Sequence, residues 1–165
     1  MSSILKWLTR ILGFLSVVCF TGIIIIVTMQ ILSRYFPYSY IWTEELTRYL
    51  FLFGIATGAP IALLRNEYIA VDIIIARFPK RVRKVFDICI MISLLLISVI
   101  MIKESLSFVQ IGTAQLSATM PIKMSWIHGS MLILSTFLSL FALVRIGYLF
   151  GNKKNPYEVE GGGEL

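Results

Sequence analysis

Charge is scarce in this sequence: Asp, Glu, Lys and Arg make up 15% of its 165 residues, whereas hydrophobic residues make up 58%. A soluble domain of this size needs a larger polar surface than so few charged residues supply. The window between Arg10 and Arg34 holds no charged residue at all. The sequence therefore predicts an integral membrane protein in contact with membrane lipids, and it leaves no soluble domain with a basic face to bind nucleic acid.

The residues that carry chemistry are also few. The single histidine is His128, and no glycine-rich phosphate loop, metal-ligand spacing or nucleophile–base pair is present. A proton relay through His128 would need further ionisable partners at depth, so we favour an interfacial histidine hydrogen-bonded to a neighbouring helix. Cys19 and Cys89 lack a Cys-x-x-Cys spacing, and we expect both to be small buried apolar residues. We therefore predict no enzyme, no cofactor and no metal site.

Apolar stretches recur along the chain and set the fold class. At about 1.5 Å per residue, roughly 20 residues cross a hydrocarbon core about 30 Å thick. We predict an all-α integral membrane protein with four transmembrane helices at about 11–33, 43–64, 85–104 and 124–144. The segment 105–122 should extend the third helix outward and then form a loop ending at Pro121. Residues 1–150 thus form one membrane domain, and the polar, glycine-rich tail 151–165 is expected to be disordered.

The basic residues predict the orientation, because cytoplasmic loops hold the excess of Lys and Arg. One side carries eleven: Lys6, Arg10, Arg65, Arg77, Lys80, Arg81, Arg83, Lys84, Arg145, Lys153 and Lys154. The other side carries four: Arg34, Arg48, Lys103 and Lys123. We therefore expect both the N-terminus and the C-terminus to be cytoplasmic.

The segment 66–79, between the second and third spans, is not an ordinary loop. Its stretch from Tyr68 to Phe78 is apolar but too short to cross the bilayer. On a helix of 3.6 residues per turn, Arg65, Asp72 and Ala76 share one face and isoleucines cover most of the rest. We predict a short membrane-interfacial arm helix here.

A charged cluster marks the start of the second span. Arg48 follows Glu44 by four residues and Glu45 by three, so both pairs share a helical face with the acid on the favourable N-terminal side. Three charges this close to hydrocarbon should need partners, since one charge at the bilayer centre costs about 2.5–3.5 kcal/mol even on the gentlest scale. We therefore expect Trp42, Glu44, Glu45 and Arg48 to contact a protein partner. Gly54 and Gly58 form a small-residue stripe on which another helix could rest.

These residues also carry a family resemblance. The run from Trp42 to Phe51, followed by Gly58-Ala59, Arg65, Ile69-Ala70-Val71-Asp72 and a proline before the last span (Pro121), resembles the small permease (DctQ-like) subunit of tripartite ATP-independent periplasmic (TRAP) transporters.

The resemblance implies a secondary transporter of the bacterial inner membrane that is driven by a sodium gradient. In such a system a periplasmic binding protein delivers an organic acid, such as a dicarboxylate or a sialic acid, to the membrane complex. The large permease subunit would hold the substrate and sodium sites, and the small subunit would be its fixed scaffold. The expected subunit-interface residues are Trp42, Glu44, Glu45, Arg48, Gly54, Gly58, Arg65 and Asp72.

Two other functions stay open at this point. A self-sufficient small exporter working as a homodimer would need an essential carboxylate in the membrane, for which Glu44 and Glu45 are the candidates. A membrane enzyme would have His128 as its sole lead. Co-purification with a large permease would favour the scaffold, proton-coupled uptake by the purified chain would favour the exporter, and full function after His128→Ala would exclude the enzyme.

Overall fold

The computed structural model describes residues 3–35, 41–65 and 80–150. These ranges form four helices: α1 (Ser3–Ser33), α2 (Trp42–Arg65), α4 (Lys80–Gly112) and α5 (Met124–Phe150). All four are long and apolar enough to cross a membrane, so the predicted fold of four helices with the length and composition of membrane spans is confirmed for the described residues. The predicted arm at 66–79 and the tail at 151–165 lie outside the described residues.

Three helices run beyond the predicted spans. The helix α1 begins at Ser3, α4 continues to Gly112 and α5 continues to Phe150. Basic side chains such as Lys6 and Arg10 do not interrupt the backbone hydrogen bonds of a helix, so the α-helix extends past the apolar window that the sequence marks. The helical extension beyond residue 104 is confirmed as far as Gly112.

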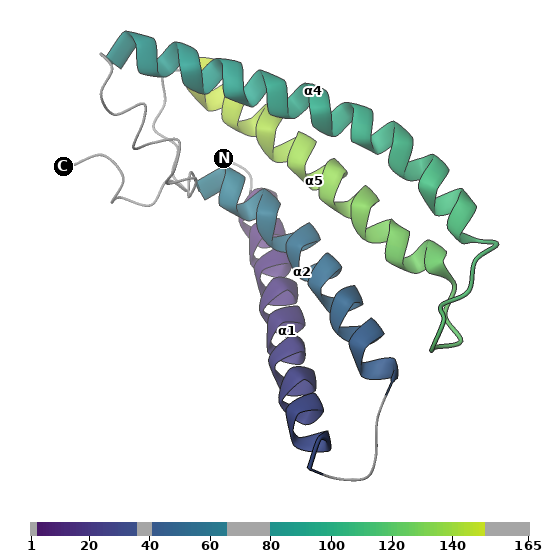
Figure 1. Cartoon of the computed structure of the whole chain (residues 1–165). Helices are drawn as coiled ribbons and strands as arrows, with labels where there is room; N and C mark the ends of the chain where they lie inside the picture. Colours follow the sequence, from purple (N-terminus) through teal and green to yellow (C-terminus); the bar gives the residue numbers. More distant parts are fainter. Residues whose placement is uncertain (1–2, 36–40, 66–79, 151–165) are drawn as a thin grey trace.

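The helices lie in an open row rather than in a closed bundle. α1 packs on α2, α2 packs on α5, and α5 packs on α4. The spatial order is therefore α1–α2–α5–α4, made of a first hairpin (α1–α2) and a second hairpin (α4–α5) (Figure 1). Towards its Ser33 end, α1 swings away from the second hairpin. The outer helices α1 and α4 each have one main neighbour in the row.

The shared apolar core lies near one end of the row. Its buried members come from the first half of α1, the last turns of α2, the first half of α4 and the last turns of α5: Leu5, Leu12, Ile61, Leu63, Leu64, Met91, Phe141 and Ala142. We call this the Arg145 end, and we call the opposite end, where α2 and α5 begin, the Glu45 end. The core joins all four helices at the Arg145 end.

Small polar residues let α4 and α5 approach each other closely. Ser98 and Ser105 of α4 and Ser130 and Ser135 of α5 are all buried. Each hydroxyl donates to a carbonyl of its own helix, as Ser98 does to Leu95 (2.9 Å). The serines are therefore satisfied locally and pack as small residues, which is a common feature of membrane helix interfaces.

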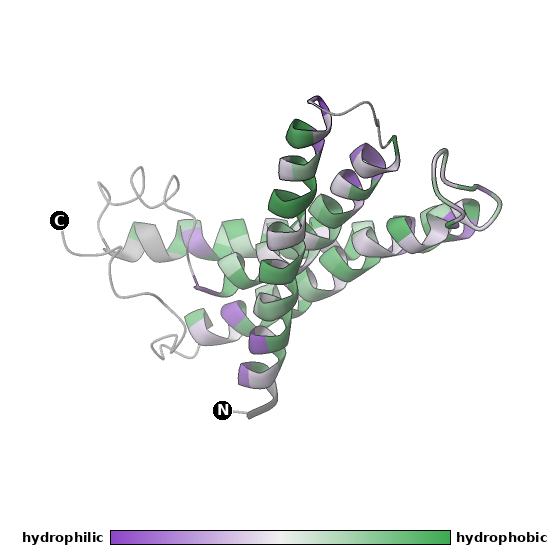
Figure 2. Ribbon diagram, turned by 90° about the horizontal axis from the view of Figure 1, so that it is seen from below, coloured by the Kyte–Doolittle hydropathy of each residue, from purple (hydrophilic) through white to green (hydrophobic). Residues whose placement is uncertain are grey.

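Much of the remaining surface is apolar. Figure 2 shows hydrophobic residues over the middle of the helices and hydrophilic ones near their ends. Large side chains are exposed along the outer helices, such as Ile24 (67%) of α1 and Leu96 (60%) of α4. Cys19 is buried as predicted, but the prediction for Cys89 is wrong: it is exposed, because α4 is the edge of the row and α5 covers only one of its sides. An apolar exposed face of this kind suits contact with lipid or with another membrane helix.

Candidate subunit interface

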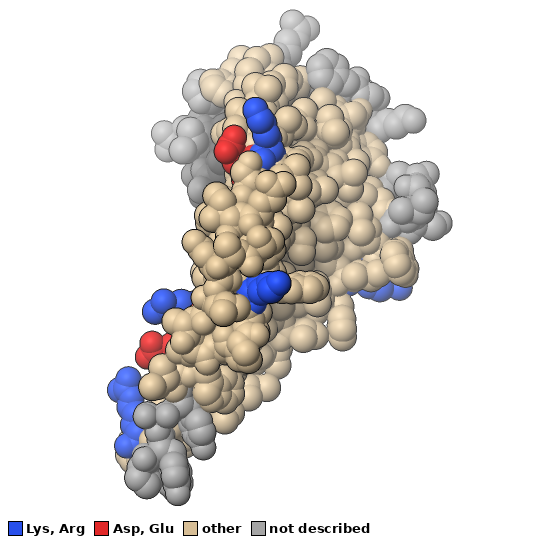
Figure 3. Space-filling view, turned by 90° about the vertical axis from the view of Figure 1, so that its right-hand side faces the viewer, with Lys and Arg blue, Asp and Glu red and all other residues tan. Residues whose placement is uncertain are grey.

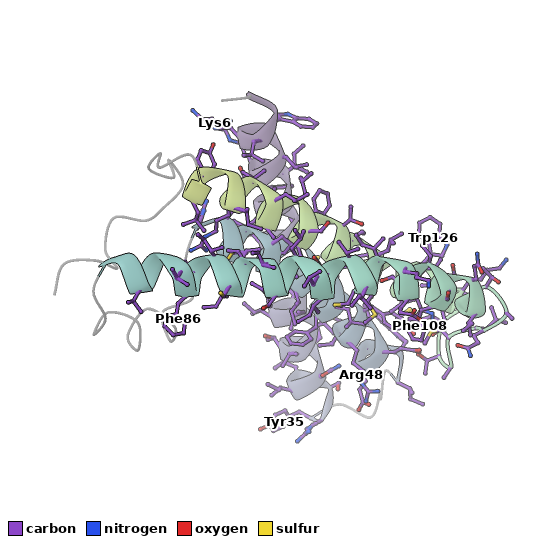
Figure 4. All side chains as sticks on the ribbon, turned by 90° about the horizontal axis from the view of Figure 1, so that it is seen from above. Lys6, Tyr35, Arg48, Phe86, Phe108 and Trp126 are labelled. Carbon is purple, nitrogen blue, oxygen red and sulfur yellow. The ribbon has the colours of Figure 1, made fainter. Side chains whose placement is uncertain are left out.

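The first turns of α2 present an exposed charged face at the Glu45 end. Trp42 is 40% exposed, and Glu44 and Arg48 are exposed as well. Arg48 projects from α2 away from α4 and α5 (Figure 4). Within residues 3–35, 41–65 and 80–150, neither Glu44 nor Arg48 forms a hydrogen bond or an ion pair with another residue. The Glu–Arg pairs expected from the spacing of these residues are therefore not formed in the structure.

Glu45 turns the other way and contacts the loop between α4 and α5. Its carboxylate accepts hydrogen bonds from the backbone N–H groups of Thr119 (2.9 Å) and Ala118 (3.4 Å). The hydroxyls of Thr119 and Tyr49 donate to the same carboxylate. Tyr49 also lies within hydrogen-bond distance of the Ser117 hydroxyl, at 3.1 Å. We call these contacts the Glu45 clasp, and they join α2 to residues 68 to 74 positions later in the chain.

The loop held by the clasp is closed on itself. Ser117 N–H donates to Ile122 O (2.9 Å), and Met124 N–H donates to Gln115 O (3.0 Å). An isolated antiparallel bridge between Leu116 and Lys123 completes the turn. These internal hydrogen bonds close the loop 113–123, and Glu45 accepts hydrogen bonds from two further backbone N–H groups of it, so the loop is a compact unit bound to α2.

Gly54 and Gly58 face α1, which is a helix of the same chain. A Cβ atom at Gly54 would lie 3.2 Å from the Phe20 ring, and one at Gly58 would lie 2.9 Å from Ser16 Oγ. The Ser16 hydroxyl donates to Gly54 O at 3.2 Å. The glycine stripe thus docks α1 closely onto α2. The expected role of these two glycines in contact with another subunit stays a prediction.

A buried arginine lies at the other end of α2. Arg145 of α5 is 7% exposed, and its Nη1 donates to Leu63 O at 2.8 Å. Leu63 O is one of the last four carbonyls of α2, which have no partner within the helix. A cation is also favourable at a helix C-terminus because of the helix dipole. Arg65, another expected interface residue, is exposed at this end.

His128 joins α4 and α5 near the Glu45 end. Its Nδ1 lies 2.9 Å from Phe108 O, and the two rings stack with centroids 3.8 Å apart. The predicted hydrogen bond to a neighbouring helix is therefore confirmed. A Cβ atom added to Gly112 would come within 2.5 Å of His128 Nδ1 and 2.7 Å of Ser125 N, so the end of α4 needs a glycine here.

The charges are few on the face seen in Figure 3, where acidic side chains lie near basic ones and most of the described surface is neither basic nor acidic. No group of three His, Cys, Asp or Glu that could hold a metal ion occurs among the described residues. Asp72, the last expected interface residue, lies outside the described ranges.

Sequence reasoning missed two of the contacts above. It counted Arg145 as a loop charge, although an arginine between Val144 and Ile146 in a continuing helical pattern was a signal of burial. It also gave no partner to Ser117 and Thr119, whose hydroxyls lie in a proline-containing turn between two apolar helices. Polar residues of this kind mark the places where a membrane protein joins its helices.

The sequence of this chain is similar to those of known proteins. Residues 23–151 match the family described as "Tripartite ATP-independent periplasmic transporters, DctQ component". A putative TRAP transporter small permease protein of Haemophilus influenzae is 31% identical over 100 residues, which cover 58% of this chain and 61% of that protein.

Two longer permeases are also similar. The isethionate TRAP transporter permease protein DctMQ of Oleidesulfovibrio alaskensis is 29% identical over 96 residues, covering 54% of this chain and 15% of that protein. The sialic acid TRAP transporter permease protein SiaT of Haemophilus influenzae is 31% identical over 81 residues, covering 48% of this chain and 13% of that protein. The matches thus span less than two thirds of each relative's length. With most of its length matched by the family, the chain belongs to the DctQ components of TRAP transporters.

Proposed function

We propose that this chain is the small membrane subunit of a sodium-driven TRAP transporter and acts as a fixed scaffold for the large permease subunit. In this proposal a periplasmic binding protein delivers the substrate, and the complex takes up an organic acid. Relatives named for sialic acid and for isethionate support an organic acid as the substrate class. The proposed location is the bacterial inner membrane, with the Arg145 end and both termini on the cytoplasmic side.

The hydrogen bonds of Glu45 and Arg145 support the scaffold role. A transport pathway in a membrane is lined by ionisable groups that face a cavity or a neighbouring ion. Here the Glu45 carboxylate accepts hydrogen bonds from backbone N–H groups of the loop, and Arg145 donates a hydrogen bond to a backbone carbonyl of α2. Both side chains therefore join helices instead of binding a substrate or an ion.

The proposed contact with the large subunit is the exposed face of α2. Glu44 and Arg48 lie at the N-terminal end of this face. Phe51 (49% exposed) and Leu52 (44% exposed) continue it along the helix. A charge close to hydrocarbon is costly without a partner. Since Glu44 and Arg48 form no ion pair within the described residues, polar groups of the large subunit would satisfy them.

Co-purification tests this proposal. We expect the double variant Glu44→Gln, Arg48→Gln to recover less large subunit from lipid nanodiscs than the wild type does. A matched control is Lys103→Gln, Glu104→Gln on α4, which also removes one acidic and one basic exposed side chain. Equal recovery for both double variants would contradict the proposed α2 interface.

A second measurement tests the scaffold role itself. The purified chain alone, reconstituted in liposomes, should not take up or release organic acids under a sodium or proton gradient. Uptake by the chain alone that is lost in Glu45→Gln would contradict the scaffold and would favour the small homodimeric exporter.

A further inference from the structure

The contact between the two hairpins is held by side-chain hydrogen bonds at two places far apart along the helices. At the Glu45 end, the clasp joins α2 to the loop of the second hairpin. At the Arg145 end, Arg145 of the second hairpin joins the last turn of α2. Leu63 lies 18 residues after Glu45, which corresponds to about 27 Å along a helix. The two contacts therefore lie near opposite ends of the contact between α2 and the second hairpin.

These hydrogen bonds differ in kind from the packing between them. Membrane helices gain no hydrophobic driving force from association, because lipid tails are as apolar as the side chains they replace. Apolar packing therefore sets the crossing angle of two helices mainly through the fit of their side chains, with a scatter of about 15–20°. Hydrogen bonds to a charged group add a directional constraint on that angle, and a side chain as buried as Arg145 (7% exposed) is costly to leave unsatisfied.

The internal hydrogen bonds of the loop allow the Glu45 clasp to position the second hairpin. Since residues 113–123 are closed by their own backbone hydrogen bonds, a grip on Ala118 and Thr119 fixes the loop as a unit. The ends of α4 and α5 enter the same loop and are in close contact at Gly112 and Ser125. The clasp therefore positions the whole second hairpin relative to α2.

We infer that Glu45 and Arg145 are positioning residues that set the angle between the two hairpins. In this inference, which rests on the proposed scaffold function, the pair keeps the open row rigid while the large subunit moves its own parts. Removing either residue loosens the joint between hairpins and leaves each hairpin folded, because α1–α2 and α4–α5 each have their own packing.

Distances between the hairpins test the inference directly. Spin labels are placed on exposed positions of α1 and α4 by Met29→Cys and Leu106→Cys, in a background with Cys19→Ala and Cys89→Ala. Double electron–electron resonance then gives the distance distribution for the full chain in nanodiscs, alone and with the large subunit. We expect Glu45→Ala to broaden and shift the distribution.

The chain offers close controls for both residues. Glu44 is the neighbouring acid but makes no hydrogen bond within the described ranges, so Glu44→Ala should leave the distribution of the chain alone unchanged. Arg145→Met should broaden the distribution at the other end of the joint, and Arg145→Lys should partly restore it because lysine still donates to Leu63 O. If Glu45→Ala does not accumulate, Glu45→Gln replaces it, since the amide keeps the shape but cannot accept from every donor of the loop.

The outcomes separate this inference from the proposed function. An unchanged distribution in Glu45→Ala and in Arg145→Met overturns the positioning role, whatever the complex does. A broadened distribution in the chain alone supports that role even if no large subunit co-purifies, in which case the proposed function fails by itself. Loss of helical content within a hairpin, measured by circular dichroism, would also overturn the inference, because it predicts that the hairpins stay folded.

Discussion

Gly112 gives a specific prediction about packing, because the structure shows which atoms a single added methyl group would meet there. The Cβ atom of Gly112→Ala would lie 2.5 Å from His128 Nδ1, 2.7 Å from Ser125 N and 2.8 Å from Ser125 Cα. Ordinary contacts of a Cβ atom begin near 3.4 Å. The contacts with the Ser125 backbone would therefore have to lengthen by 3.4 − 2.8 = 0.6 Å to 3.4 − 2.7 = 0.7 Å, and the His128 ring would have to move as well.

This separation sets the expected loss of stability. Overpacking a well-packed contact costs about 1–3 kcal/mol. A weakened hydrogen bond between His128 and Phe108 would add little, since such bonds average about 0.6 kcal/mol between membrane helices. Alanine is intrinsically about 1 kcal/mol better than glycine inside a helix, but Gly112 is the last residue of α4, where this gain is smaller. We therefore expect Gly112→Ala to destabilise the second hairpin by about 1–3 kcal/mol.

Reversible unfolding in mixed detergent and SDS micelles measures the effect. Gly129→Ala in α5 is the matched control, because no heavy atom lies within 4 Å of its added Cβ atom. The control should be as stable as the wild type or slightly more stable. If Gly112→Ala were as stable as Gly129→Ala, the close approach of α4 and α5 deduced from the structure would be refuted.

Three further predictions concern single contacts. Gly58→Ala should be mild, because Ser16 Oγ at 2.9 Å can rotate away, whereas Gly58→Leu should separate α1 from α2 and lower unfolding stability by about 1–3 kcal/mol. Ser16→Ala removes the bond to Gly54 O and should cost about 0.6 kcal/mol in the same unfolding assay. His128→Ala should leave uptake by the reconstituted complex intact, while a loss of uptake without loss of protein would revive a chemical role for this histidine.

The helices were predictable because their signal is local. The composition of an uncharged window such as 11–33 or 124–144 is itself enough to indicate a span. The second and third spans were predicted from apolar stretches that carry charged residues near their ends. The ends were harder to place, since Lys6 and Arg10 allow α1 to continue into the headgroup region. The exposure of Cys89 was missed for another reason. It depends on which helix lies at the edge of the row, and the sequence of α4 does not indicate its place in the row.

The contacts of Glu45 and Arg145 could not be derived from sequence spacing. Spacing rules pair Glu45 with Arg48, which is on the same helix, but the donors that hold it include backbone N–H groups 73 and 74 residues away. Every residue except proline offers such a group, so the sequence does not distinguish the right ones. The same holds for Arg145, whose acceptor is a backbone carbonyl. A side chain that binds backbone reveals its partner only in the folded structure.

The exposed apolar surface does not by itself locate the partner. In water, side chains as exposed as Ile24 or Leu96 would mark an interface, but in a bilayer they contact lipid at no cost. What distinguishes one face from another here is its polar groups, because charges near hydrocarbon need partners. Glu44 and Arg48 on α2 therefore indicate the partner-binding face better than the larger apolar faces of α1 and α4 do. It follows that apolar substitutions on α1, such as Ile24→Ala, should leave recovery of the large subunit unchanged in the same nanodisc assay. If Ile24→Ala lowered that recovery as far as Glu44→Gln, Arg48→Gln did, apolar shape rather than charge would define the interface.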